Sequence, residues 1–288
     1  MNLFDLPVLV DRFSADAELF VLSHYHRDHM DGLGAGWRRG PLLCSPITAS
    51  LLSALDALPP QTLRVIQPDE MQEISVAGQT LCVTALEANH CPGALMFVFE
   101  CRGRKIIYTG DFRLNHHLRQ KRTLLAGADV LYVDSTYASP EYKFPTQEQS
   151  VEMVLQAVRA NVEKEIMLAI YTIGKSRILQ ALFDEFRRPV YVSKEKLAAY
   201  NAMGYGNLVT ASRKDAGFIG YSREYFDRYF RWTRERNPSN CLVIYPSGMC
   251  TGVRPREGFF YVPYSEHCDW HEFSEFVEMV AAREVVKT

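Results

Sequence analysis

The sequence has little that would tie it to a membrane or to an oxidising compartment. No run approaches the roughly 18 uncharged apolar residues that a membrane-spanning helix needs. The N-terminus has no basic start and is interrupted by Asp5 and Asp11, so we expect no signal peptide and no membrane attachment. The seven cysteines are an odd number and form no C-x-x-C pair, which predicts reduced thiols inside a cell rather than disulfides or a thiolate zinc site.

A strong excess of positive charge is also missing. The net charge of −2 at pH 7 argues against a protein that binds polyanions without specificity, because such domains are usually strongly basic. One local exception lies between Arg102 and Arg122, where seven Lys or Arg residues accompany a single acid, Asp111. This stretch could be the solvated turn of a hairpin with the start of a helix, or a patch that faces the substrate.

Short segments rich in Val, Leu, Ile and Phe dominate the first half of the chain and predict strands. These segments are 7–13, 19–23, 42–44, 62–66, 72–76, 79–85, 94–101, 105–109 and 130–133. The spacing of apolar residues in 46–58 predicts a helix among them. Several of the loops that follow the strands carry a His or an Asp, so we expect these loops to assemble a site.

The pattern changes after Pro145 to an alternation of helices and strands, which predicts a small parallel sheet. The helices expected from here on are 146–163, 176–185, 194–203, 222–236 and 270–282. The strands expected from here on are 166–171, 189–192, 241–245 and 258–263. We therefore expect one larger domain of the αββα type, 1–144 with 241–288, interrupted by an α/β insertion at 145–240.

The pattern H-x-H-x-D-H at 24–29 places four metal-binding side chains within six residues: His24, His26, Asp28 and His29. The spacing requires an extended, turning backbone, because a helix would point His24 and His26 to different faces. Imidazole and carboxylate together suit zinc or manganese better than calcium. Accidental clustering of this kind is rare, so the sequence predicts a metal site here.

Three further residues at strand ends supply what the motif lacks: His90, Asp111 and His267. Each alone is as well explained by an ordinary hydrogen-bonded polar residue. Together they allow a full assignment, with one metal on His24, His26 and His90, a second on Asp28, His29 and His267, and Asp111 as the bridge. Two cations about 3.5–4 Å apart lower the pKa of a shared water towards about 7. The ligands therefore predict a hydrolase, but they do not choose between phosphorus and an acyl or lactam carbonyl.

The segments around these ligands resemble one protein family. They are SHYHRDHMDGL, EANHCPGALMFVFE, IIYTGDFR, LYVDSTY, YTIGKS and VPYSEHCDW. The chain is similar to the β-CASP branch of the metallo-β-lactamases, and within it to the DNA crosslink-repair nucleases that include Artemis and Apollo. The resemblance implies an α/β (α+β) fold, in which an αββα metallo-β-lactamase sandwich (1–144 and 241–288) is split by an inserted β-CASP domain (145–240).

The resemblance also implies roles for individual residues. Asp11 matches an acid that supports the metal loop without binding metal, and Asp134, in DSTY, matches one that orients a metal ligand. The residues implied in catalysis, which is attack of a metal-bound hydroxide on a DNA phosphodiester, are Asp28, His29, Asp111, Asp134 and His267. The implied cofactor is zinc, as one or two ions, with magnesium or manganese able to support activity in the second position.

Three residues match the pocket that grips a 5′-phosphate in exonucleases of this family: Tyr137, Lys175 and Ser265. One ammonium and two hydroxyls suit a terminal phosphate dianion. Lys175 would also stand at a helix start, where the dipole opposes a cation, and an anionic ligand would relieve this. Endonucleases of the branch lack the Tyr and the Lys. The chain departs from the family at Ser176, where a Glu is common, and a lost negative charge should not hinder phosphate binding.

The favoured function is therefore a 5′-phosphate-dependent 5′-to-3′ DNA exonuclease of interstrand crosslink repair or end processing. The alternatives are a structure-specific endonuclease of the Artemis type and a β-CASP RNA-processing nuclease; a β-lactam hydrolase and a non-catalytic scaffold are less favoured. RNA-cutting relatives use another His near the chain's end, and His271 lies too close to His267 to serve. We expect 5′-phosphorylated DNA, single-stranded or at duplex ends, as the partner of a monomer. The family implies the nucleus in a eukaryote and otherwise the cytoplasm.

Overall fold

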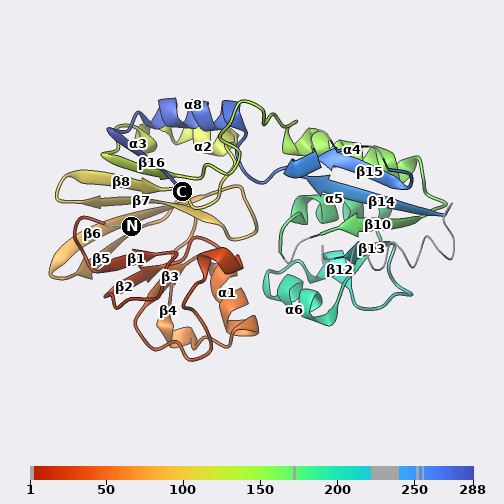
Figure 1. The fold of residues 1–288 in the computed structure, drawn as a ribbon. Coiled ribbons are helices and arrows are strands. Elements are labelled where there is room, and N and C mark those ends of the chain that lie inside the picture. The colour runs from red at the N-terminus through yellow and green to blue at the C-terminus, as the bar shows by residue number, and fades with distance from the viewer. Residues whose placement is uncertain (1–2, 171–172, 222–239, 251–252, 255) are drawn as a thin grey trace. The chain divides into compact units, whose positions relative to one another are not determined.

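The computed structural model describes residues 3–170, 173–221, 240–250, 253–254 and 256–288. The chain folds as two compact units, unit 1 (Met1–Lys143 with Glu266–Thr288) and unit 2 (Phe144–Ser265) (Figure 1). The charged helix expected at 222–236 lies outside the described residues. Among the residues that are described, no helix is long and apolar enough to cross a bilayer.

Unit 1 contains two sheets. The first is parallel, with the order β1-β2-β3-β4, and consists of β1 (Val8–Val10), β2 (Leu19–Val21), β3 (Leu42–Cys44) and β4 (Leu63–Val65). The second has the order β16-β9-β8-β7-β6-β5. It consists of β5 (Met71–Val76), β6 (Gln79–Glu87), β7 (Leu95–Cys101), β8 (Arg104–Tyr108), β9 (Val130–Val133) and β16 (Glu284–Lys287). Strands β5 to β8 are antiparallel neighbours, as the hairpin turns at Gly78 and Gly103 predict.

The two sheets of unit 1 share one apolar core. Val21 and Leu43 of the first sheet and Val83, Phe97 and Phe99 of the second are all buried in it. Helices cover the outer faces: α1 (Pro46–Leu55) beside the first sheet, and α2 (His116–Gln120), α3 (Arg122–Leu125) and α8 (Trp270–Val280) over the second (Figure 1). Unit 1 is thus the αββα sandwich that the sequence predicts.

Helix α8 starts and ends at well-defined residues. The Asp269 carboxylate accepts hydrogen bonds from the N–H groups of His271 (2.9 Å) and Glu272 (3.0 Å), and the Glu272 carboxylate accepts one from the Asp269 N–H (3.2 Å). Ala281 is left-handed, with φ 48°, so the helix ends earlier than predicted. Residues 284–287 then form β16, parallel to β9, where no strand was predicted.

Unit 2 is built on a six-stranded parallel sheet with the order β12-β11-β13-β10-β14-β15. Its strands are β10 (Glu165–Ala169), β11 (Val190–Tyr191), β12 (Val209–Thr210), β13 (Phe218–Tyr221), β14 (Cys241–Ser247) and β15 (Phe259–Pro263). Its described helices are α4 (Gln147–Arg159), α5 (Ser176–Phe186) and α6 (Lys194–Ala202). Single 3-10 turns occur in the two units at Arg27–His29, Pro60–Thr62, Gly206–Leu208 and Gly248–Cys250.

Strand pairing assigns residues 241–263 differently from the sequence. Both strands of this segment join the sheet of unit 2, with Glu165 of β10 opposite Cys241 of β14, whereas the sequence analysis grouped them with the closing part of the larger domain. The apolar pattern of a strand does not show its partner, which explains the difference. The Ser150 hydroxyl of α4 donates to the Pro263 carbonyl oxygen at 2.6 Å, so the first helix of unit 2 is bonded to its last strand.

Candidate metal centre

One buried carboxylate, that of Asp11, contacts the loop that carries the H-x-H-x-D-H motif. Asp11 follows β1 with a left-handed backbone (φ 52°). It accepts hydrogen bonds from the Ser23 N–H at 2.8 Å and the Ser23 hydroxyl at 2.6 Å, directly before the motif. The Tyr108 hydroxyl donates to it at 2.8 Å, and His29 Nδ1 lies 2.8 Å from it. Asp11 therefore contacts the motif and the residue before it, and its role as a support of the metal loop stays a prediction.

Three imidazole nitrogens converge above this support. His24 Nε2 lies 2.9 Å from His26 Nδ1, and His26 Nδ1 lies 3.1 Å from His90 Nε2. The hydrogen bonds of the Nδ1 atoms fix the tautomers of His90 and His24. His90 Nδ1 donates to the Glu266 carbonyl oxygen (2.9 Å), and His24 Nδ1 donates to Ser23 Oγ (2.9 Å), whose own proton goes to Asp11. The Nε2 atoms of His24 and His90, which face His26, therefore carry no proton and offer lone pairs.

This convergence fits a metal ion better than it fits hydrogen bonding. A single ring proton on His26 can satisfy one neighbouring lone pair, but a cation can satisfy all three nitrogens at once. Burial and the neighbouring histidines lower the pKa of His26 to about 3 and the pKa of His24 well below its usual value. Both rings are neutral near pH 7, which is the form that binds a metal.

Asp111 faces two groups of nitrogens with its two oxygens. Oδ2 lies 3.6 Å from both His24 Nε2 and His90 Nε2, and Oδ1 lies 3.3 Å from His29 Nε2. Gly110 makes this position possible, since it has φ 52° and a Cβ there would lie 2.8 Å from the Cβ of Ser23. A carboxylate between two ligand groups is the geometry of a bridge.

The charges around His29 show that a cation is favoured beside Asp111. Burial lowers the pKa of His29, but hydrogen bonds to Asp11 and Asp111 outweigh it and raise the pKa to about 11. Burial likewise raises the pKa of Asp111, but the hydrogen bond with His29 and the nearby histidines outweigh it, and the pKa falls well below its usual value. The space between these two side chains thus takes positive charge, which either a proton or a metal ion can supply.

His267 joins the cluster from the other end of unit 1. One of its ring nitrogens lies within 4.8 Å of a ring nitrogen of His90 and of a carboxylate oxygen of Asp111. His267 Nδ1 lies 2.7 Å from Asp134 Oδ2, while Asp134 Oδ1 accepts from the N–H (2.9 Å) and hydroxyl (2.6 Å) of Thr136. Asp134 thus lies within hydrogen-bonding distance of His267, and its role in orienting this residue stays a prediction.

Asp28 and Cys91 are placed differently from the arrangement expected from the sequence. The side chain of Asp28 is 79% exposed, and its nearest cluster atom is His29 Nε2, at 3.8 Å. Asp28 therefore lies at the rim, outside the groups that the fold gathers among the described residues. Cys91, which the sequence did not single out as a ligand, groups with His24, His26 and His90. Burial raises the pKa of its thiol well above the usual range, which disfavours the thiolate that a metal binds.

The three residues expected to bind a 5′-phosphate belong to different units. In unit 1, the ring of Tyr137 lies 5.9 Å from that of His267 and 4.8 Å from that of Tyr142. In unit 2, Lys175 and Ser265 are buried, and Lys175 Nζ donates to the Ala169 carbonyl oxygen at 2.9 Å. Lys175 precedes α5 with a left-handed backbone (φ 64°). Each is thus placed within its own unit.

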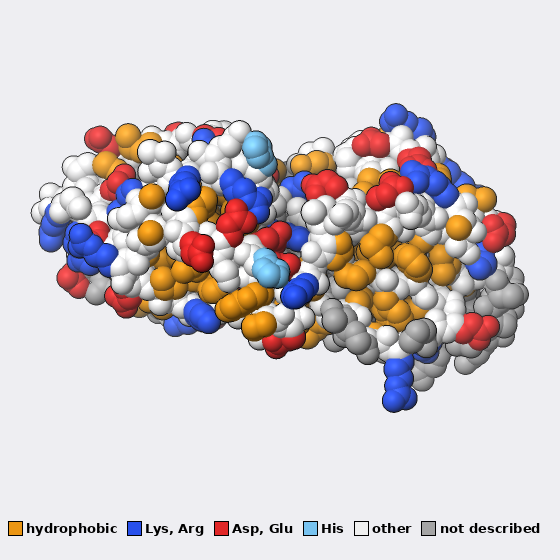
Figure 2. Space-filling view, turned by 90° about the horizontal axis from the view of Figure 1, so that it is seen from above, with side chains coloured by type: hydrophobic (Ala, Val, Ile, Leu, Met, Phe, Trp, Pro, Cys, Tyr) orange, Lys and Arg blue, Asp and Glu red, His pale blue; other side chains and the backbone are white. Residues whose placement is uncertain are grey.

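The basic stretch between Arg102 and Arg122 is occupied by structural contacts. Arg113 is buried and pairs with Glu272 at 3.1 Å. Its neighbours are also engaged: Lys105 with the carbonyl oxygens of Leu124 and Ala126, Arg119 with Glu275, and Lys121 with Asp69. On the face shown in Figure 2, the Lys and Arg side chains of each unit lie among Asp and Glu side chains. These contacts favour the structural interpretation of the stretch.

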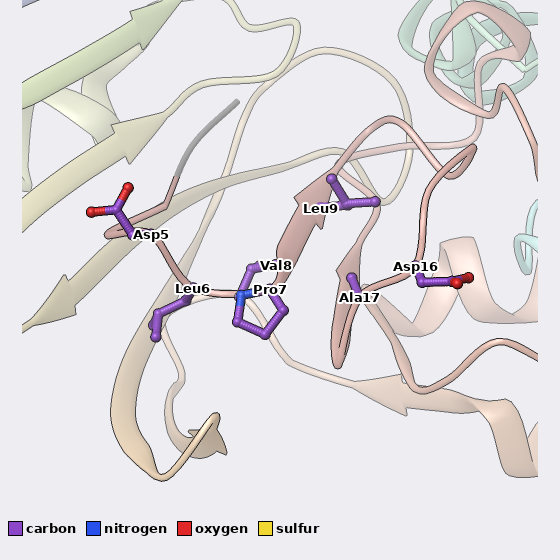
Figure 3. A pocket seen from close by; sticks show the side chains of 7 residues that line it. All are labelled: Asp5, Leu6, Pro7, Val8, Leu9, Asp16 and Ala17. Carbon is purple, nitrogen blue, oxygen red and sulfur yellow. The ribbon is translucent and has the colours of Figure 1, made fainter.

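A separate pocket of about 370 Å³ lies at the N-terminal segment of unit 1 (Figure 3). It is lined by Asp5, Leu6, Pro7, Val8, Leu9, Asp16 and Ala17. Its two carboxylates point away from each other, and its lining contains no histidine (Figure 3). The chemistry of the chain therefore lies in the histidine cluster and not in this pocket.

Comparisons with known proteins show the family of the chain. The profile of the family described as "Beta-lactamase superfamily domain" matches residues 4–179, and that described as "DNA repair metallo-beta-lactamase" matches residues 214–288. The 5′ exonuclease Apollo of Mus musculus is 31% identical over 97% of this chain and 53% of its own length. Apollo of Gallus gallus is 33% identical over 97% and 61%, and the DNA cross-link repair 1A protein of Homo sapiens is 29% identical over 93% and 28%.

The chain thus spans about half the length of the Apollo relatives that it matches. A solved structure titled as a protein of unknown function from Enterococcus faecalis V583 superposes with a TM-score of 0.63 at 16% identity. It covers 93% of this chain and 74% of its own, and this likeness concerns the fold alone.

Proposed function

This chain belongs to the beta-lactamase superfamily and carries a DNA repair metallo-beta-lactamase segment, and on that premise we propose that it is a metal-dependent 5′-to-3′ DNA exonuclease. The family predicted from the sequence motifs is confirmed by these matches. The relatives named as 5′ exonucleases support the proposed reaction. A nuclear site of action in a eukaryotic cell, in crosslink repair or end processing, belongs to the same proposal.

The observation that carries the proposal is the position of Asp111. Its two oxygens face separate groups of nitrogens, so one carboxylate can serve two cations. The first cation would be held by His24, His26 and His90, and the second by His29 and His267, with Asp28 turning in from the rim. Zinc suits so many imidazoles, and magnesium or manganese suits the more carboxylate-rich second position. When bound, such a pair supplies Lewis acidity and a water of lowered pKa as the nucleophile.

The protein's own residues prepare the site for this chemistry. Asp11 holds His29, and Asp134 holds His267, so that the second nitrogen of each ring is aimed at Asp111 or its neighbours. The ionised carboxylate of Asp111 balances part of the positive charge. A phosphodiester carries two non-bridging oxygens that need such charge stabilisation in the transition state.

The choice of a 5′-phosphorylated end rests on Tyr137, Lys175 and Ser265. Lys175 is buried and has a left-handed backbone at the start of α5. Such backbone strain at a residue other than glycine gathers at functional sites. The N-terminal end of a helix together with an ammonium attracts a phosphate dianion. The strand would be gripped by its terminal phosphate and cut at the adjoining linkage.

A time course on end-labelled oligonucleotides tests the proposal directly. With zinc or manganese present, we expect 5′-phosphorylated single strands of DNA to be shortened stepwise, and 5′-hydroxyl strands to react much more slowly. A single internal cut would instead support the endonuclease alternative, and faster cleavage of a matched RNA strand would support the RNA-processing alternative. Equal rates on both 5′ ends would contradict the proposed phosphate pocket.

Replacing Lys175 should change end preference without changing metal content. We expect Lys175→Ala to reduce the preference for 5′-phosphate over 5′-hydroxyl by about tenfold, because one charge-assisted hydrogen bond is lost. Steady-state rates on the two substrates, with zinc content measured in the same preparation, provide the check. Lys214→Ala is the matched control, since this lysine of unit 2 is exposed. An unchanged preference in Lys175→Ala would remove the residue from the proposed pocket.

A further inference from the structure

A second lysine of unit 2 reaches the same end of the central strand as Lys175. Lys196 Nζ donates to the carbonyl oxygen of Ile170 at 2.9 Å, and Lys175 Nζ donates to that of Ala169, also at 2.9 Å. These carbonyls belong to successive residues at the carboxyl end of β10. Parallel α/β sheets bind ligands outside the carboxyl ends of their strands, where successive connections run to opposite sides.

The sheet order places such a reversal at β10. In the order of the strands, β11, which follows β10 in the chain, lies on one side of β10, and β14 lies on the other side. The N–H of Ile170 bonds to Tyr221 of β13, so Ile170 faces the β13 side. Lys175 and Lys196 therefore bracket the end of β10 at the position where this class of sheet takes a ligand.

The ammonium of Lys196 has no acidic partner among the described residues. Within the part of the chain that the structure describes, its one side-chain hydrogen bond goes to a backbone carbonyl, so two of its three donors can serve another acceptor. Burial is the cause that lowers the pKa of Lys196, to about 8, with no carboxylate to oppose it. Glu195, next in the chain, is exposed and interacts with Ser193 and Lys194 instead. A half-buried charge of this kind is costly unless an anion joins it.

The position of Lys196 in α6 adds to this cost. It lies in the first turn of the helix, where the dipole disfavours cations, and its backbone N–H is already capped by the Ser193 hydroxyl. One turn later on the same face, the buried Tyr200 hydroxyl donates to the Gly174 carbonyl oxygen at 3.4 Å. Gly174 precedes Lys175, so this face of α6 packs on the loop that carries the first lysine.

We propose that Lys196 binds an internal backbone phosphate of the nucleic-acid strand whose terminal phosphate Lys175 holds. This inference rests on the proposed function and extends it from one phosphate contact in unit 2 to two. The arrangement grips the strand through its charges and not its bases, so it suits any sequence. It also implies that a strand with an internal phosphate is held more tightly than a mononucleotide.

The inference is tested by measuring the binding of a 5′-phosphorylated single-stranded oligonucleotide by fluorescence anisotropy. A chelator is added to remove metal ions and so prevent cleavage. We expect Lys196→Gln to weaken binding about tenfold. Its plot of log affinity against log salt should flatten by about 0.7, the contribution of one single-strand phosphate contact. Lys194→Gln is the matched control, an exposed lysine in the same turn with the same change of charge, and its slope should stay close to that of the wild type.

Two further variants guard against a trivial result. Lys196→Met fills a similar volume without charge and should behave like Lys196→Gln, whereas Lys196→Arg should keep the wild-type slope. Equal affinities and slopes for Lys196→Gln and Lys194→Gln would overturn the inference, and so would a wild type that does not bind the oligonucleotide. A wild type that binds but does not hydrolyse DNA with metal added would instead fail the proposed function, while the comparison of the two lysines would still decide the role of Lys196.

Discussion

Replacing Asp111 by asparagine should abolish DNA hydrolysis, with a loss of about a thousandfold or more in kcat. The amide keeps the size of the side chain but removes the negative charge that faces His24 and His90 on one oxygen and His29 on the other. Two cations held close together then lack the anion between them, so the second is lost or displaced. We expect at most one bound metal per chain, measured by mass spectrometry of the metal content beside the rate assay.

The size of this effect distinguishes a bridge from an ordinary ligand. Asp111→Ala should behave like Asp111→Asn, because charge and not bulk is what the position supplies. The matched control is Asp16→Asn, which removes the same charge from an exposed acid of unit 1 that lines the separate pocket. If Asp111→Asn kept a tenth of the wild-type rate with two metals bound, the bridge would have to be assigned elsewhere.

Replacing Asp11 by alanine should damage stability and metal binding together. The carboxylate accepts hydrogen bonds from Ser23 and Tyr108 and contacts His29, so its removal leaves several donors unsatisfied in the interior. Each such donor costs about 1–3 kcal/mol, and loss of the network should lower the free energy of unfolding by about 3–5 kcal/mol. Loss of the support for His29 should weaken metal affinity by about 10–100-fold.

Denaturant titration and competition with a chelating dye measure these two effects separately. Asp11→Asn keeps the shape of the side chain and an acceptor for Ser23 but removes the charge. Compared with Asp11→Ala, it should recover much of the stability but little of the metal affinity. Asp16→Ala should change neither quantity. Wild-type stability in Asp11→Ala would show that the network is not needed to hold the motif.

The sequence predicted what depends on local pattern. The strand at 94–101 carries five apolar residues of β7, and the H-x-H-x-D-H motif contains its own spacing, so each could be found without knowing its neighbours. The short strands β12 and β13 were missed, because two to four residues carry too little periodicity. Residues 284–287 were missed for the same reason and because β9, their partner, lies far away in the chain.

The parts of the site that were missed depend on tertiary contacts. Ser23 and Tyr108 meet at Asp11 only after β1, β2 and β8 have packed, and no spacing in the sequence connects them. Cys91 follows a predicted ligand, yet only the fold brings its sulfur beside His24 and His26. From the sequence, Lys196 is an ordinary exposed helix residue. Only the fold shows that its Nζ donates to the carbonyl oxygen of Ile170.

The hydrogen bond between Ser150 and Pro263 joins the two ends of the chain within unit 2. The chain enters unit 2 after Asp111 and leaves it just before His267, so during synthesis the cluster stays incomplete until all of unit 2 has left the ribosome. Once folded, unit 2 keeps its first helix on its last strand, which removes most of the entropic cost of closing so long a loop. If unit 2 unfolded, the entropy of the long open loop would oppose the placement of His267 in the cluster. We therefore expect the folding of unit 2 to affect metal retention by unit 1, although unit 2 supplies none of the clustered histidines.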